Sequence, residues 1–201
     1  MLAVIDYGSG NLGSLIGALE RHKVAFDVTG DAQRIARATA VIFPGDGAFP
    51  ATMQALRERH LDSALRDLIE RGGSYLGICV GMQILFESSD EFAGSRGLGI
   101  FPGKISRILN APRIPHMGWN TLTRTGDHAL VEGLQENEYV YFLHSYCAPV
   151  GSMTVATATH GQTFSAIVAQ GRTMGMQFHP EKSQGTGAAL LTRFLQFARV
   201  A

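Results

Sequence analysis

Cysteine is scarce in this sequence, and its placement argues against a metal site or a disulfide framework. Cys79 and Cys147 are the only two among 201 residues, and neither forms a CxxC pair or neighbours a pair of histidines. The seven histidines show no metal-ligand spacing either, so we predict no metal and no cofactor. Free thiols are typical of a reducing compartment.

Net charge and long hydrophobic runs are also missing. The chain has 17 basic and 17 acidic residues, so no overall field attracts it to phosphate backbones or anionic lipid. No apolar run approaches the roughly 20 residues that cross a bilayer, and the first residues lack the basic start of a signal peptide. We therefore predict a cytoplasmic protein that binds neither nucleic acid nor membranes.

What the chain does have is a globular composition. Apolar residues make up 45% of it, which is sufficient for a buried core without metal or disulfide. The length predicts a single domain over residues 1–201. Glycine is abundant at 24 residues, often where an apolar run ends, and this pattern predicts tight turns after strands.

The first hundred residues alternate between predicted strands and predicted helices. The strands lie at residues 2–6, 25–29, 40–45 and 74–79. The helices lie at residues 11–22, 51–60, 61–72 and 81–88. After about Gly97 the pattern is strand-rich, with one long strand predicted at 138–148, until a last helix at 187–200. The predicted fold class is α/β, a three-layer structure with a mostly parallel sheet flanked by helices and a strand-rich C-terminal half.

The strongest candidate for chemistry is the segment Gly77-Ile78-Cys79-Val80-Gly81, which joins a predicted strand to a predicted helix. It has the G-x-nucleophile-x-G form of a nucleophile elbow, with cysteine as the nucleophile. A strained turn would present Cys79, and the following helix would favour its thiolate. The alternative is a buried cysteine in a strand-to-helix corner. Cys147 has no flanking glycine and is predicted to be structural.

A second candidate is His179-Pro180-Glu181. Proline keeps His179 extended, so the carboxylate of Glu181 can orient the imidazole and stabilise its protonated form. Alone, the three residues could equally form a surface loop, but with Cys79 they complete a cysteine, histidine and carboxylate set. His144 is a rival base, although no carboxylate lies near it in the sequence.

Backbone amides would complete such a site by binding the oxyanion. The amide of Val80, directly after the nucleophile, is one candidate donor. The glycine-flanked turn Gly45-Asp46-Gly47 offers a second, unless it is an ordinary turn.

Near the start, a literal GxGxxG from Gly8 to Gly13 favours a different class of protein, one that binds a dinucleotide. Asp31 follows 18 residues beyond that motif, close to where a ribose-binding acid would lie. Against this interpretation, Asp6 and Tyr7 separate the apolar strand from the first glycine, and Cys79 would have no role.

Two segments, LGICVGMQILF and GMQFHPEKS, resemble the triad (class I) glutamine amidotransferases. The resemblance becomes more specific with four other segments, which are IDYGSGN, GLGIFPG, IPHMGWN and YFLHSY. With them, the chain is similar to one group of that family, the glutaminase subunits of imidazole glycerol phosphate synthase, which act in histidine biosynthesis. The resemblance runs from Asp6 to Lys182 with the motifs in the family's order.

The resemblance implies that Cys79 attacks the side-chain amide of glutamine, His179 transfers protons and Glu181 orients His179. It also implies an oxyanion strand and a glutamine site, formed by Gly45, Asp46, Gly47, Gln83, Ser145 and Tyr146. Ammonia would pass to a (β/α)₈-barrel cyclase subunit, in a heterodimer, and react there with an aminoimidazole carboxamide nucleotide. The residues implied at the subunit contact and ammonia gate are Asn11, Pro115, Met117, Trp119, Tyr141 and Lys182; core packing is the alternative for Met117 and Trp119.

One residue departs from the family, because Asp46 lies where valine is common in its Pro-Gly-x-Gly motif. An inward carboxylate would disfavour a nearby thiolate or oxyanion. Two other functions stay open on the sequence: a different triad glutaminase, against which PHMGWN argues, and a non-catalytic α/β scaffold.

Overall fold

The central feature of the protein is an eight-stranded sheet, seen here in a computed structural model that describes residues 1–8, 12–92 and 94–200. Its strand order is β2-β1-β3-β4-β14-β13-β12-β9. The strands are β1 (Leu2–Ile5), β2 (Phe26–Thr29), β3 (Ala40–Phe43), β4 (Ser74–Ile78), β9 (Thr123–Arg124), β12 (Thr154–His160), β13 (Gln162–Gln170) and β14 (Thr173–Met176). From β2 to β14 neighbouring strands are parallel, and from β14 to β9 they are antiparallel.

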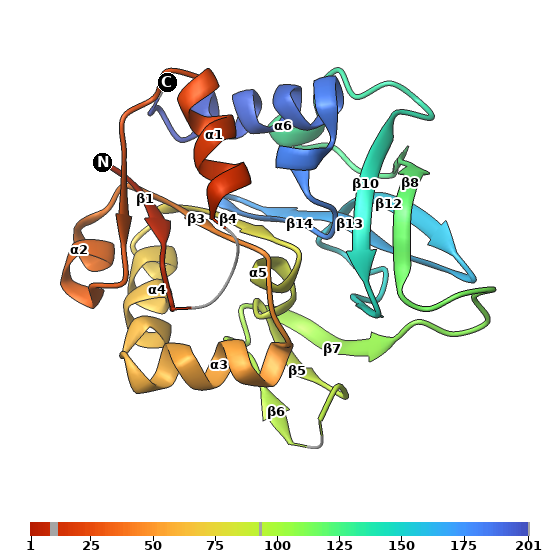
Figure 1. The fold of residues 1–201 in the computed structure, drawn as a ribbon, viewed down its shortest axis with the longest axis horizontal. Coiled ribbons are helices and arrows are strands. Elements are labelled where there is room, and N and C mark those ends of the chain that lie inside the picture. Colours follow the sequence, from red (N-terminus) through yellow and green to blue (C-terminus); the bar gives the residue numbers. More distant parts are fainter. Residues whose placement is uncertain (9–11, 93, 201) are drawn as a thin grey trace.

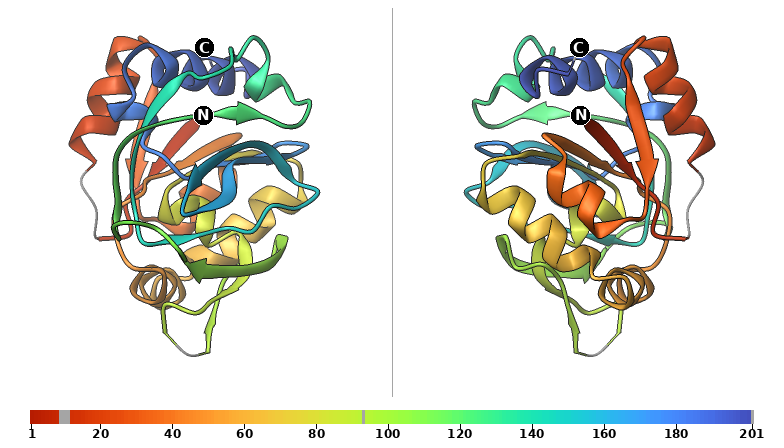
Figure 2. Two further views of the ribbon diagram at one scale, coloured as in Figure 1. Left: turned by 90° about the vertical axis from the view of Figure 1, so that its right-hand side faces the viewer. Right: turned by 90° about the vertical axis from the view of Figure 1, so that its left-hand side faces the viewer.

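Helices cover both faces of this sheet (Figures 1 and 2). They are α1 (Gly13–Arg21), α2 (Ala32–Arg37), α3 (Phe49–Glu58), α4 (Leu61–Glu70), α5 (Val80–Gln83) and α6 (Gln184–Phe197), with 3₁₀ turns η1 (Ala129–Val131) and η2 (Pro180–Lys182). One core lies under α1 and α6, and the other lies under α2, α3 and α4. In β1, Leu2 and Val4 face the first core while Ala3 and Ile5 face the second, which is why that strand is continuously apolar. The predicted fold class is confirmed.

Two smaller sheets extend this framework. One pairs β8 (His116–Thr121) with β10 (Tyr139–His144), and the other has the order β11-β7-β5-β6. The strands of the second are β5 (Phe86–Ser89), β6 (Ser95–Arg96), β7 (Phe101–Arg107) and β11 (Tyr146–Cys147). The strand-rich C-terminal half thus consists of the antiparallel strands of the main sheet together with most of these added strands. None of the helices in the described part of the chain is long and apolar enough to span a membrane.

Two predicted elements were wrong. The helix predicted at 81–88 ends after α5, and the chain continues as β5, because the carbonyl of Ile84 accepts the amide of Leu98 (2.7 Å) instead of continuing the helix. The single strand predicted at 138–148 is two, β10 and β11, which belong to different sheets. The break between them at Ser145 forms part of the wall of a pocket described below.

Candidate active site

Cys79 occupies a strained turn between β4 and α5. Its φ of 49° and ψ of −108° are values that residues other than glycine rarely adopt. The two flanking glycines leave no room for a side chain. A Cβ on Gly77 would lie 2.1 Å from the carbonyl oxygen of Gly81, and a Cβ on Gly81 would lie 2.7 Å from the carbonyl oxygen of Phe43. The turn therefore has the geometry predicted for a nucleophile elbow. The helix that follows it, however, is only four residues long.

We expect Gly77→Ala to lower the free energy of unfolding by about 3 kcal/mol, because the added methyl group meets backbone atoms that cannot rotate away. Gly185→Ala is the matched control. A Cβ there meets nothing within 4 Å, so this variant should stay within about 0.5 kcal/mol of wild type. Urea denaturation measures both variants, and equal midpoints would contradict the expectation.

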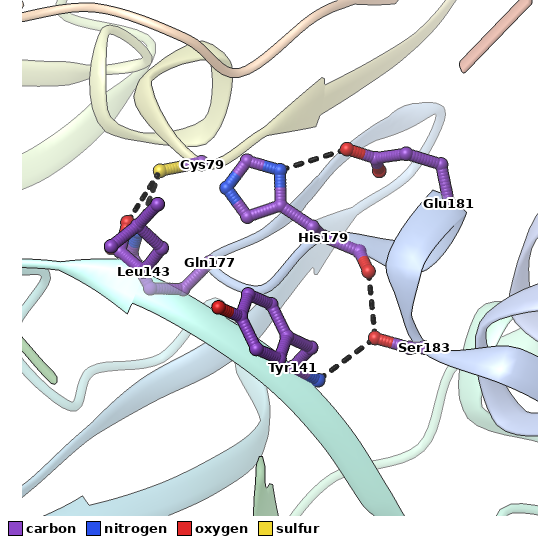
Figure 3. Close-up of polar contacts among 7 residues, drawn as sticks. All are labelled: Cys79, Tyr141, Leu143, Gln177, His179, Glu181 and Ser183. Atoms are coloured by element: carbon purple, nitrogen blue, oxygen red, sulfur yellow. Dashed lines mark hydrogen bonds and ion pairs between the residues drawn. The ribbon is translucent and has the colours of Figure 1, made fainter. Parts of the chain in front are cut away.

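His179 is fixed from three directions (Figure 3). Its backbone amide donates to the carbonyl of Tyr141 (2.9 Å), and its own carbonyl accepts the hydroxyl of Ser183 (2.6 Å). Its ring Nδ1 lies 2.8 Å from Oε1 of Glu181, and the two side chains are only 3% and 9% exposed. The carboxylate thus holds Nδ1–H, and the other ring nitrogen is left on the side of Cys79.

Two opposing effects set the protonation of His179. Burial disfavours the charged imidazole, but hydrogen bonds and charge interactions with Cys79 and Glu181 outweigh it and raise the pKa of His179 to about 10. The imidazole is therefore protonated at neutral pH. The charged imidazole beside Sγ holds a proton that it can pass to a leaving group.

The thiol of Cys79 has two further contacts. Sγ lies 3.7 Å from the carbonyl oxygen of Leu143 and 3.6 Å from Nε2 of Gln177. Gln177 is fully buried. Gln177 was not among the residues predicted for the site, although it lies only two residues before His179. Its polar character within the apolar segment TMGMQF was the available signal.

A pocket of about 260 Å³ opens beside Cys79. It is lined by Gly47, Ala48, Cys79, Gln83, Glu91, Pro115, Leu143, His144, Ser145 and Tyr146. Of the residues expected to bind the oxyanion or glutamine, Gly47, Gln83, Ser145 and Tyr146 line it. Gly45 packs directly against the elbow, where a Cβ would lie 2.8 Å from that of Cys79. Asp46 and Val80 are not among the lining residues; Val80 begins α5.

Two pocket residues differ from expectation. Gln83 borders the pocket, but its amide nitrogen donates to the carbonyl of Tyr146 (2.9 Å) and to Oε1 of Gln177 (3.0 Å), so both protons are engaged within the protein. Glu91 was not foreseen. Its Oε2 accepts the amide of Phe49 (2.8 Å) at the start of α3, which brings a carboxylate to the pocket. No local signal marked Glu91, since its place depends on a contact with Phe49, 42 residues earlier in the chain.

The rival base and the second thiol have other surroundings. His144 bonds to His116 (2.9 Å) and to the carbonyl of Tyr146 (2.9 Å), and burial lowers the pKa of His144 to about 3. Such a ring is a weak base. Cys147 is buried, and burial raises the pKa of its thiol to about 11.

Four of the residues expected at a partner contact share one region. Met117 and Trp119 on β8 are 61% and 46% exposed, which excludes core packing for them. Tyr141 packs edge-on against Trp119, with ring centroids 6.0 Å apart, and Lys182 is exposed. Pro115 lies in the wall of the Cys79 pocket. The last of the expected residues, Asn11, lies outside the described residues.

Asp31, the acidic residue that the dinucleotide interpretation requires, has a structural role instead. Oδ1 of Asp31 accepts the amides of Gln33 (2.7 Å) and Arg34 (3.3 Å), so Asp31 caps the N-terminus of α2. The sequence did not reveal this short helix. Residues 9–11 of the glycine motif lie outside the described residues.

Comparisons with known proteins agree with the geometry. Residues 3–197 match the family model described as glutamine amidotransferase class-I. The chain is 43% identical over 201 residues to imidazole glycerol phosphate synthase subunit HisH of Oceanobacillus iheyensis, covering 99% of this chain and 100% of that protein. It is 44% identical to HisH of Microcystis aeruginosa, covering 98% and 95% of the two chains.

Solved structures are similar in fold. A crystal structure described as a glutamine amidotransferase superposes with a TM-score of 0.78 at 21% identity, covering 98% of this chain and 99% of that chain. The chain therefore belongs to the class-I glutamine amidotransferase family, within the group of HisH subunits of imidazole glycerol phosphate synthase.

Proposed function

We propose that this chain hydrolyses glutamine to glutamate and ammonia through Cys79, His179 and Glu181. The observation that carries the proposal is the contact of thiol, imidazole and carboxylate beside a pocket, with Cys79 on a strained turn. Sγ attacks the side-chain amide carbon of glutamine, and His179 gives its proton to the leaving ammonia. His179 then takes a proton from the water that hydrolyses the thioester. Glu181 keeps the imidazole oriented throughout.

The pocket wall supplies groups that suit glutamine. Glu91 is the carboxylate that would accept a hydrogen bond from the substrate's α-ammonium, while Ser145 and Tyr146 also line the pocket. The developing oxyanion would accept hydrogen bonds from the Val80 amide, at the start of α5, and from an amide of the turn at Gly47. Gly45 and Asp46 belong to the same turn.

We further propose that residues 1–201 act as one amidotransferase domain that forms a cytoplasmic heterodimer with a (β/α)₈-barrel cyclase subunit. Its contact surface would contain Asn11, Pro115, Met117, Trp119, Tyr141 and Lys182. The exposed apolar side chains on β8 support this assignment, because large exposed aromatic and methionine side chains are enriched at protein interfaces. Ammonia would pass through that contact to the cyclase, which uses it in a lyase reaction.

The proposal is tested by measuring glutamate release in three conditions: the chain alone, the chain with its cyclase subunit, and the complex with the cyclase's aminoimidazole carboxamide nucleotide. We expect slow release by the chain alone and the fastest release by the loaded complex, because ammonia freed without an acceptor is lost. Release that is equally fast in all three conditions would instead indicate a different triad glutaminase. No release in any condition would contradict the proposed activity.

A further inference from the structure

The pairing of β8 with β10 places two buried histidines side by side. His116 and His144 are opposite each other in the register and are 4% and 6% exposed. Nδ1 of His116 lies 2.9 Å from Nε2 of His144. The His116 ring is also stacked between Phe142 (centroids 4.6 Å apart) and His160 (4.1 Å), so it cannot turn freely. The proposed glutaminase mechanism uses neither histidine.

The neighbours of the pair fix the position of every proton. Nδ1 of His144 must donate to the carbonyl of Tyr146 (2.9 Å), so Nε2 of the neutral ring accepts the Nδ1–H of His116. Nε2 of His116 in turn accepts the amide nitrogen of Asn120 (3.2 Å), which also donates to the carbonyl of Thr159 (2.9 Å). Burial lowers the pKa of His116 to about 4 and that of His144 to about 3, in agreement with two neutral rings. The hydrogen bonds therefore all run in one direction, from β8 toward Tyr146.

The Tyr146 carbonyl connects this series of hydrogen bonds to the nucleophile, Cys79. It accepts a second donor, Nε2 of Gln83 (2.9 Å), which also donates to Oε1 of Gln177 (3.0 Å). Nε2 of Gln177 then contacts Sγ of Cys79 (3.6 Å; Figure 3). Gln83 and Gln177 are 5% and 0% exposed, so water cannot readily replace a missing partner. An unbroken series of buried hydrogen bonds thus runs from β8 to the thiol.

We infer that His116 and His144 are positioning residues for Cys79: they set the Tyr146 carbonyl and, through Gln83 and Gln177, the placement of the thiol. This inference rests on the proposed glutaminase function. It also gives the exposed side chains of β8 a physical route to the site, because Met117 follows His116 directly in that strand. A partner that shifts β8 would shift the first member of the series.

The test compares His116→Leu with His116→Asn in the complex of the full chain and its cyclase. Leucine removes the N–H that His144 requires, so we expect kcat for glutamine to fall about tenfold with KM little changed. Asparagine keeps an amide N–H near the position of Nδ1, so it should restore most of the lost rate. His144→Leu should lower kcat to the same extent, since either variant interrupts the same series, although KM can also change in this variant because His144 lines the pocket.

His160→Leu is the matched control. It changes the ring stacked on His116, but His160 bonds outward to the carbonyl of Arg113 (2.8 Å) and is not in the series. Its kcat should stay within about twofold of wild type. Because packing damage would lower the melting temperature in step with the rate, the melting temperature of each variant is measured as well.

Alkylation of Cys79 by iodoacetamide gives a readout that does not require turnover. We expect slower alkylation in His116→Leu and recovery in His116→Asn.

If His116→Leu retains wild-type kcat and alkylation while wild type is active, the inference is wrong and the proposed function stands. If rate follows melting temperature in all variants, including His160→Leu, the pair is only structural. If wild type itself releases no glutamate, the proposed function fails, and the alkylation rates still decide whether the pair positions the thiol.

Discussion

Cys79→Ala should abolish glutamine hydrolysis, with kcat at least about a thousandfold below wild type. The proposed thioester forms only through Sγ, and no other thiol can replace it, since Cys147 is buried in β11. Glutamate release by the loaded cyclase complex measures the loss. Cys147→Ala is the control and should retain a rate within about threefold of wild type.

The same variant separates an enzyme from a scaffold, because alanine at this position leaves the surface unchanged. Cys79 is only 7% exposed, and the turn already holds a residue with a Cβ at a φ of 49°, so Cys79→Ala adds no backbone strain. We expect it to bind the cyclase subunit as tightly as wild type in a titration. Undiminished glutamate release by Cys79→Ala would refute the proposed nucleophile, whereas tight binding by both proteins with no release even by wild type would favour the non-catalytic alternative.

The parts of the site that the sequence predicted depend on contacts between near neighbours in the chain. Gly77 is required because its own turn folds back on it at Gly81, although Gly81 itself is required by Phe43 of the neighbouring strand β3. His179 and Glu181 are two residues apart, so their 2.8 Å contact follows from local geometry. Short-range constraints of this kind are visible in one sequence without knowledge of the tertiary fold.

The parts that the sequence did not predict depend on distant pairings. Gln83 meets Gln177 across 94 residues, and His116 meets His144 only because β8 pairs with β10 in one register. The helix wrongly predicted at 81–88 is explained in the same way. Ile84, Leu85 and Phe86 are all buried, and a short buried apolar run fits a helix or a strand equally well. Tertiary hydrogen bonds decided between them.

Glu181→Gln should lower kcat about a hundredfold, because the amide replaces the charge that orients and stabilises the protonated imidazole. The exposed Glu136 offers a matched control, and Glu136→Gln should keep the wild-type rate. Circular dichroism and the melting temperature would show whether Glu181→Gln remains folded. A rate equal to wild type would mean that His179 is oriented by its backbone contacts alone.

The pH dependence of stability tests the same contact independently of catalysis. The pKa of folded His179, about 10, lies above its ordinary value of 6.5. The charged ring therefore stabilises the fold fully below pH 6.5, and this contribution is lost as the pH rises through about 10. Removing the carboxylate removes much of the contribution, so Glu181→Gln should be less stable than wild type by about 2 kcal/mol near neutral pH.

That difference should shrink as the pH approaches 10, where wild type loses its own proton. Urea denaturation of both proteins across this range measures it, with Glu136→Gln as the reference for a lost surface charge. A difference that stays constant with pH would show that the contact stabilises the fold through hydrogen bonding alone. His179 would then be neutral at rest, and its first role in the reaction would be to accept the thiol proton rather than to donate one to ammonia.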